Sequence, residues 1–184
     1  MSKIANLIAA NAKKAVFFNV FDNTNEKVQF SRFKEKDAEG KPVFDKFTAT
    51  LSGFNAAVTE NNALVYDFKA LNIPASNGKK ERFEVALQLG ATTDADKQRL
   101  YGAVWHNEGK DGAALSEGAP ALRGAVGYKE GSTQVEYQIA IWNVAAKEGK
   151  KAYRSVKITE KQVNDAPAVP AGEAASFQDS DVPF

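Results

Sequence analysis

The sequence contains no cysteine and only one histidine, His106, among its 184 residues. Without cysteine there can be no disulfide, zinc ribbon, iron–sulfur cluster or thiol nucleophile. A single histidine excludes metal sites built on two imidazoles and leaves one candidate base for a Ser–His–Asp triad. A large excess of charge of one sign is also lacking, because 24 Lys and Arg balance 23 Asp and Glu to a net charge of +1. These shortages argue against catalysis, and the near-neutral total argues at first against a nucleic-acid partner.

Long apolar runs are absent as well. The first apolar segment, residues 4–10, is interrupted by Asn6 and is too short for a secretory signal. No other segment approaches the roughly 20 apolar residues of a membrane-spanning helix. The sequence therefore predicts a cytoplasmic protein without a membrane partner.

The sequence does contain segments in which apolar and polar residues alternate with a period of two. In residues 81–89 every second residue from Phe83 to Leu89 is apolar and most of the residues between them are polar, the pattern of a half-buried strand. Ahead of the strands, residues 2–14 carry apolar side chains at helical spacing behind Ser2 as N-cap, which predicts a short N-terminal helix. Because turn-forming segments rather than helices separate the alternating runs, we expect a mainly β protein, an antiparallel sandwich or small barrel. The further runs occupy 15–21, 27–33, 43–51, 63–71, 99–105, 121–128, 133–144 and 152–158.

The composition changes at Lys161. Residues 162–184 contain no Lys or Arg but four acids, three prolines and five alanines, a composition that cannot bury enough apolar surface to fold. We therefore expect a folded domain over residues 1–161 and a disordered acidic tail over 162–184. The domain keeps all 24 basic residues and 19 acidic ones, a net charge of +5, whereas the tail carries −4. The near-neutral total thus combines a basic domain with an acidic tail and no longer argues against nucleic acid.

Two neighbouring runs place aromatic side chains among polar ones. In a strand, residues with the same parity of residue number (odd or even) share one face. Trp142 shares its parity with polar residues of 133–144, and Tyr153 shares its parity with Lys157. Such a surface suits single-stranded nucleic acid, because rings stack on bases and cations neutralise phosphates. The alternative is that these aromatic side chains pack in the core and that the lysines of 147–151 lie in a solvated turn. The candidate DNA-binding residues are Trp142, Tyr153, Trp105, Tyr101, Arg99, Lys147, Lys150, Lys151, Arg154 and Lys157, with Phe33 and Phe44 as weaker candidates.

The last six residues, 179–184, combine acids with a terminal apolar pair after a Pro- and Ala-rich segment. They resemble the acidic C-terminal tip of bacterial single-stranded DNA-binding proteins, which ends in acids followed by Ile, Pro and Phe. Val182 stands here in place of Ile and Ser180 in place of one acid. The greater length of the domain makes the chain more similar to a bacteriophage member. The tip residues that carry the resemblance are Asp179, Asp181, Val182, Pro183 and Phe184.

The resemblance implies an OB-fold-like barrel that binds and protects single-stranded DNA, with tolerance of sequence, during replication, recombination and repair. It also implies a tip that recruits replication and repair proteins, and a place in the cytoplasm of a bacterium or a phage-infected host. These implications are expectations for the structure to test.

An enzyme is not expected. The sequence contains no P-loop, no motif surrounds His106, and Asp94 and Asp96 lack the other ligands of a calcium loop. We therefore expect no cofactor and no metal. Two other functions stay open. A structural β-sandwich, such as a phage particle component, would bury Trp142 and Tyr153. An RNA-binding protein would use the same surface of aromatic and basic side chains. The oligomeric state is also open, with a homo-oligomer among the alternatives.

Overall fold

The computed structural model describes residues 2–58, 63–90, 93, 95, 97–109 and 113–161. The expected acidic tail, residues 162–184, lies outside the described residues together with its tip, as do Asp94 and Asp96. Within the described part the chain forms one helix, α1 (Lys3–Ala10), and ten strands. The strands are β1 (Val16–Asp22), β2 (Gln29–Lys36), β3 (Pro42–Thr48), β4 (Leu51–Val58), β5 (Ala63–Ile73), β6 (Arg82–Leu89), β7 (Gln98–His106), β8 (Leu122–Glu130), β9 (Thr133–Val144) and β10 (Tyr153–Glu160).

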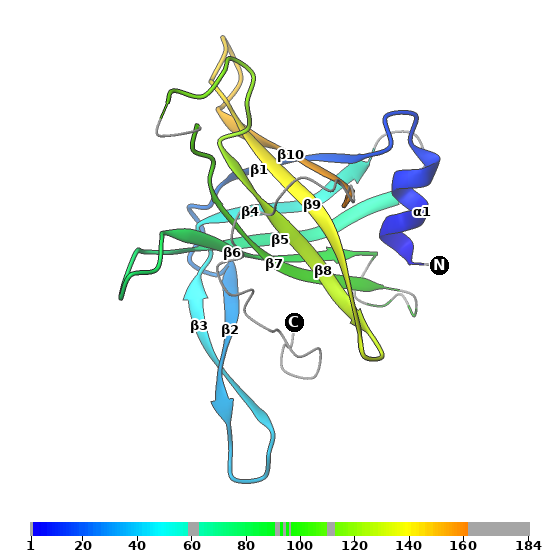
Figure 1. The fold of residues 1–184 in the computed structure, drawn as a ribbon, viewed down its shortest axis with the longest axis vertical. Helices are drawn as coiled ribbons and strands as arrows, with labels where there is room; N and C mark the ends of the chain where they lie inside the picture. The colour runs from blue at the N-terminus through cyan, green and yellow to red at the C-terminus, as the bar shows by residue number, and fades with distance from the viewer. Residues whose placement is uncertain are drawn as a thin grey trace.

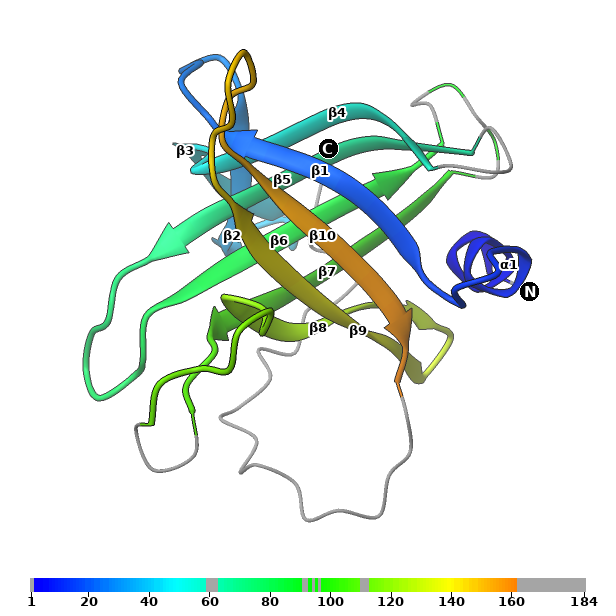
Figure 2. The same ribbon diagram turned by 90° about the horizontal axis from the view of Figure 1, so that it is seen from above.

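Eight of the strands form a closed antiparallel barrel in the order β1-β10-β9-β8-β7-β6-β5-β4. From β4 to β10 each strand pairs with the next along the chain, and β1 closes the barrel by pairing with both β10 and β4. The expectation of a mainly β antiparallel barrel with a short N-terminal helix is therefore confirmed (Figures 1 and 2). An OB-fold is a five-stranded Greek-key barrel, so the strand number and the strand order here differ from those that the resemblance implied.

The barrel interior is a packed apolar core. Where the barrel strands have described side chains, alternate residues point inward, as the period of two predicts. Phe18 and Phe68 meet edge to face with ring centroids 5.5 Å apart. The helix α1 lies at one end of the barrel (Figure 2), where Ile4 and Ile8 join the same core. Several of the largest core side chains are at most 2% exposed: Phe68, Leu87, Leu100, Ile139, Ile141 and Ile158.

The helix begins where the sequence predicts but ends earlier than Lys14. The Ser2 hydroxyl caps it by accepting a hydrogen bond from the Ala5 N–H, at 3.2 Å. Asn11 ends it, because its backbone turns to an extended conformation and its side chain accepts from the Lys13 N–H. The Ser2 hydroxyl also lies 3.0 Å from the Tyr137 hydroxyl of β9, so the cap attaches the helix to the barrel.

The hairpin of β2 and β3 is inserted between β1 and β4 and projects from the barrel (Figure 1); we call residues 29–48 the arm. At its foot Phe30 joins Ala49, Leu71 and Ala86 in a second apolar cluster outside the barrel. This cluster corrects one expectation: β6 is buried on both faces rather than half-buried. Its outward residues were expected to face solvent, but Phe30 packs with Ala86 and Arg32 pairs with Glu84, so the arm covers the middle of this face.

The predicted run 43–51 is divided into two strands. The chain leaves the arm at Thr48 and enters the barrel at Leu51, and the Thr50 N–H donates to the Ala70 carbonyl of β5 at this junction. Most of β4 was missed because its sequence, LSGFNAAV, has no regular alternation of apolar and polar residues.

The strands β7 and β8 approach each other more closely than side chains allow at two positions. A Cβ on Gly102 would lie 1.9 Å from the Ala125 carbonyl oxygen, and a Cβ on Gly124 would lie 1.9 Å from that of Ala103. Only glycine fits at such a backbone contact. Glycine at these two positions therefore permits the close pairing of β7 and β8 that brings their outward side chains together.

Candidate nucleic-acid interface

The outer surface of the barrel carries one continuous row of opposed residues that crosses its strands. Directly opposed residues on paired strands share a face of the sheet, so the pairing register alone defines the row. Neighbouring strands are about 4.8 Å apart, so a row over six strands spans roughly 24 Å. We call it the transverse row: Phe17 (β1), Lys157 (β10), Ala140 (β9), Arg123 (β8), Trp105 (β7) and Arg82 (β6).

The transverse row faces away from the core. The residues adjacent to its members in sequence, such as Val104 beside Trp105 and Leu122 beside Arg123, are fully buried in the barrel. Arg123 is exposed, and the other large side chains of the row are half-buried. At the β1 end, the ammonium groups of Lys13 and Lys157 lie 5.6 and 5.8 Å from the Phe17 ring centroid, within cation–π distance. The row therefore places a cationic residue next to each of its two aromatic rings, with Ala140 between Lys157 and Arg123.

Trp142 lies beside this row on β9, two residues beyond Ala140 and opposite Ser155. Its indole N–H donates to the carbonyl oxygen of Gly118 at 2.8 Å, which attaches the loop before β8 to the outer face of β9. The ring is half-buried and outward. This orientation is the one that the parity of 133–144 predicts.

Tyr153 continues the same outer face toward the end of the barrel. Its ring centroid lies 6.4 Å from that of Phe21, which is 47% exposed. Ser155 separates it from Lys157 along β10. Trp142, Tyr153 and Lys157 are therefore brought together on adjacent strands.

The three lysines of the expected backbone path lie just beyond Tyr153, in and after the turn between β9 and β10. Lys147 and Lys150 form an isolated bridge whose Lys150 N–H donates to the Lys147 carbonyl at 2.8 Å. These two lysines and Lys151 are exposed. They extend the cationic border past the end of the barrel.

Arg154 does not join this surface. It lies opposite Val20 of β1, so its parity is the inward one, and its guanidinium pairs with Asp22 at 3.1 Å at the barrel end. This differs from the expectation that Arg154 follows the backbone path, because its neighbour Tyr153 is the residue on the outward parity.

Tyr101 and Arg99 point outward on β7 but lie toward the arm. Tyr101 packs against the second apolar cluster at the foot of the arm. Arg99 donates from Nε to the side-chain oxygen of Gln88, at 3.3 Å. Tyr101 is four residues from Trp105, or about 13 Å along the strand. The structure therefore separates these two residues from the Trp142 region, and of the β7 candidates it places Trp105 in the row.

The sequence interpretation assigned Phe17 and Phe21 mainly to the core, but both lie on the outer surface, in or near the transverse row. It did not single out Arg82 and Arg123, which are members of the row. The outward parity of Arg123 within 121–128 could have been noticed. Its position between Trp105 and Ala140 depends on strand pairing, which no local pattern encodes. The weaker candidates Phe33 and Phe44 lie on the arm, where their rings form an edge-to-face pair with centroids 6.0 Å apart.

The described residues offer neither a metal-binding cluster nor a membrane-spanning helix. Nowhere in that part of the chain do three or more His, Asp or Glu side chains gather in a way that could hold a metal ion. None of its helical structure has the length and apolar character needed to cross a membrane.

No protein-family model, no curated protein and no solved structure matches this chain. The strand pairing of the chain is therefore the basis for its fold, and its outer surface is the basis for the functional proposal.

Proposed function

We propose that the protein binds single-stranded DNA across the outer face of the barrel and protects it during replication, recombination and repair. The observation that carries the proposal is the transverse row, in which Trp105 lies between Arg123 and Arg82 and Lys157 lies next to Phe17. Single strands require aromatic rings that stack on bases and cations that follow the phosphates. The row offers both on neighbouring strands.

A second line of groups runs beside the row. Trp142, Tyr153 and Phe21 supply further rings, and the lysines of 147–151 supply charge where β9 turns into β10. Every base has a face that can stack, so binding through such a surface tolerates sequence. The interior of the barrel is filled by its core side chains, and the proposed path therefore runs over the outer face of the barrel.

The acidic tail has a separate part in the proposal. Pro183 and Phe184 suit a small apolar pocket on a replication or repair protein, and Asp179 and Asp181 suit a basic rim around that pocket, which assists encounter and specificity. The same acids would compete with phosphates for the basic domain. Removal of 179–184 should then strengthen DNA binding at low salt and abolish partner recruitment.

The test is a tryptophan fluorescence titration of the full chain with oligo-dT at several salt concentrations. We expect quenching on binding and a linear fall of log K with log salt, with a slope of about −0.7 per phosphate contact. Double-stranded DNA of the same length is the control for strand preference, and oligo-rU separates DNA from RNA. Absence of quenching, or an affinity that ignores salt, would contradict the proposal.

A further inference from the structure

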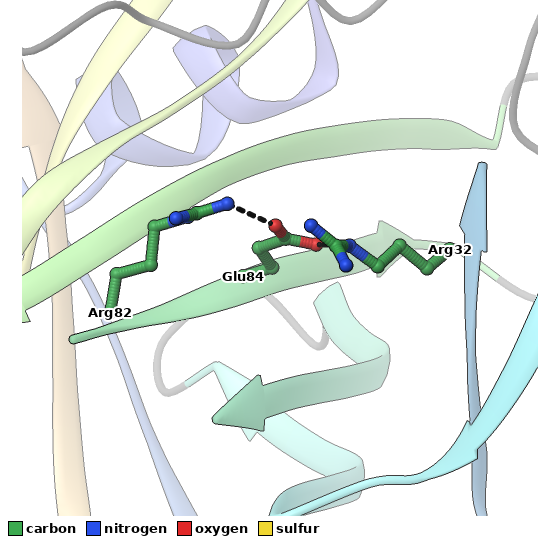
Figure 3. A network of polar contacts seen from close by, with 3 residues as sticks. All are labelled: Arg32, Arg82 and Glu84. Carbon is green, nitrogen blue, oxygen red and sulfur yellow. Dashed lines mark hydrogen bonds and ion pairs between the residues drawn. The ribbon is translucent and has the colours of Figure 1, made fainter. Parts of the chain in front are cut away.

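A three-residue ionic cluster lies at the foot of the arm, where the transverse row ends. The carboxylate of Glu84 on β6 is 5% exposed. Its Oε1 accepts from Arg82 Nη2 at 2.8 Å, and its Oε2 accepts from Arg32 Nε at 3.0 Å. Figure 3 shows the two guanidinium groups approaching this carboxylate from opposite sides, one from β6 and one from the arm.

The cluster has more charge and more donors than its own contacts use. Two guanidinium groups face one carboxylate, which leaves a net charge of +1. A guanidinium carries five N–H donors, and each of these two makes one hydrogen bond within the described part of the chain, the bond to Glu84. The side chains of Arg82 and Arg32 are 19% and 41% exposed. Donors are therefore available to an anion from solvent.

The buried carboxylate also holds both groups in place. Charge-assisted hydrogen bonds are short and directional, and the planar fork of arginine matches the oxygen geometry of a phosphate. Because Glu84 restrains the rotamers of Arg82 and Arg32 before any ligand arrives, little further ordering is needed on binding. This is the arrangement of a preorganised anion site.

Its location connects the cluster to the transverse row. Arg82 is the last member of the row and lies directly opposite Trp105, whereas Arg32 belongs to β2. A strand whose base stacks on Trp105 would bring its next phosphate to this pair of guanidinium groups.

We propose that Arg32 and Arg82, oriented by Glu84, bind one backbone phosphate of single-stranded nucleic acid and direct the strand from the barrel onto the arm. The inference rests on the proposed function, and it adds a specific phosphate site and a direction to it. The alternative is a structural role only, in which the Arg32–Glu84 contact fastens the arm to the barrel.

The experiment compares Arg82→Gln and Arg32→Gln with the unsubstituted chain in oligo-dT titrations from 50 to 200 mM salt. Over this range, the affinity of a protein that releases counterions from phosphates falls steeply with salt. Each substitution should weaken binding roughly tenfold at low salt and reduce the salt slope by about 0.7. Lys129→Gln is the matched control: it removes the same charge on β8, about 20 Å along the strand from Arg123, and should leave the slope close to that of the unsubstituted chain.

A second measurement does not depend on substitution. In the unsubstituted chain, the Nε–Hε resonances of Arg32 and Arg82 should shift on addition of oligo-dT. If the chain binds oligo-dT and Trp105→Ala weakens that binding, but both arginine variants keep the full salt slope and neither resonance moves, the cluster is structural and the inference is wrong. If the unsubstituted chain does not bind oligo-dT at all, the proposed function itself fails, and the inference fails with it.

Discussion

Trp105 and Arg123 are directly opposed residues on the antiparallel strands β7 and β8, so their Cβ atoms are separated by about 5 Å on the outer surface. Arg82 opposes the same tryptophan from β6. One aromatic ring thus has a guanidinium-bearing residue on each side in the direction that crosses the strands. For a nucleic acid on this surface, a base on the ring would have a cation near each of its flanking phosphates.

Trp105→Ala should weaken oligo-dT binding by about 1–3 kcal/mol, the usual loss when one stacked base loses its aromatic partner. Fluorescence anisotropy of a labelled oligonucleotide measures the change. Trp105→Phe keeps a ring at the same position and should recover most of the affinity. Equal losses in the two variants would mean that the ring does not stack.

Lys157→Gln should change the salt dependence of binding rather than its tolerance of sequence. Lys157 lies in the transverse row next to Phe17, where an ammonium would release one counterion on meeting a phosphate. The slope of log K against log salt should therefore decrease by about 0.7. Lys14→Gln, which removes a lysine that donates to the Ala9 carbonyl near the end of α1, is the comparison and should leave the slope unchanged.

Phe30→Ala should destabilise the protein by about 3 kcal/mol, because Phe30 is buried in the second cluster against Leu71 and Ala86. Urea unfolding measures the free energy. Phe33→Ala removes an equal volume from an arm side chain that is 39% exposed and should cost less than about 1 kcal/mol. A similar cost for both would mean that the arm does not pack on the barrel as the structure shows.

Tyr137 should make stability fall at high pH. Burial raises the pKa of Tyr137 above its ordinary value of 10.0, and its hydrogen bond with Ser2 opposes that shift. Because the folded state retains the phenolic proton more strongly than the unfolded state, the free energy of unfolding is unaffected well below pH 10 and decreases as pH rises above it. Urea unfolding between pH 8 and about 11 should show this slope, and Tyr137→Phe should lose the Tyr137 contribution to it.

The Ser2–Tyr137 contact gives a further check on the same residue at neutral pH. Ser2→Ala removes both the helix cap and the contact and should cost about 1–2 kcal/mol, whereas Tyr137→Phe removes the contact but keeps the helix cap and should cost about 1 kcal/mol. The double variant should cost less than the sum of the two. Additive costs would show that the two hydroxyl groups do not interact.

For β6, local alternation was sufficient to predict which face enters the core. Phe83 and Leu87 of β6 are inward as their spacing predicts. The same spacing placed Glu84 in solvent, yet Glu84 is buried because Arg32 and the arm cover it. That contact joins residues 52 positions apart, and no period within β6 can reveal it.

The candidate DNA-binding residues show the same difference between what local alternation predicts and what depends on strand pairing. Parity alone placed Trp142 and Tyr153 outward, in agreement with the structure. Parity also contained the information that Arg154 points the other way, since it matches buried Val156, and the sequence interpretation did not use it. Arg123 could not be placed next to Trp105 without the pairing of β7 with β8, which depends on the whole barrel.

The pairing of β1 with β10 also sets an order of events during synthesis. Val16, Phe18 and Val20 leave the ribosome early, but their three partners on β10 follow about 140 residues later. At roughly 5–20 residues per second, this strand waits about 7–28 s for its neighbour, with only a short pairing to β4 in the meantime. The nascent chain therefore carries an apolar strand that a chaperone or another nascent chain can reach until β10 has left the ribosome.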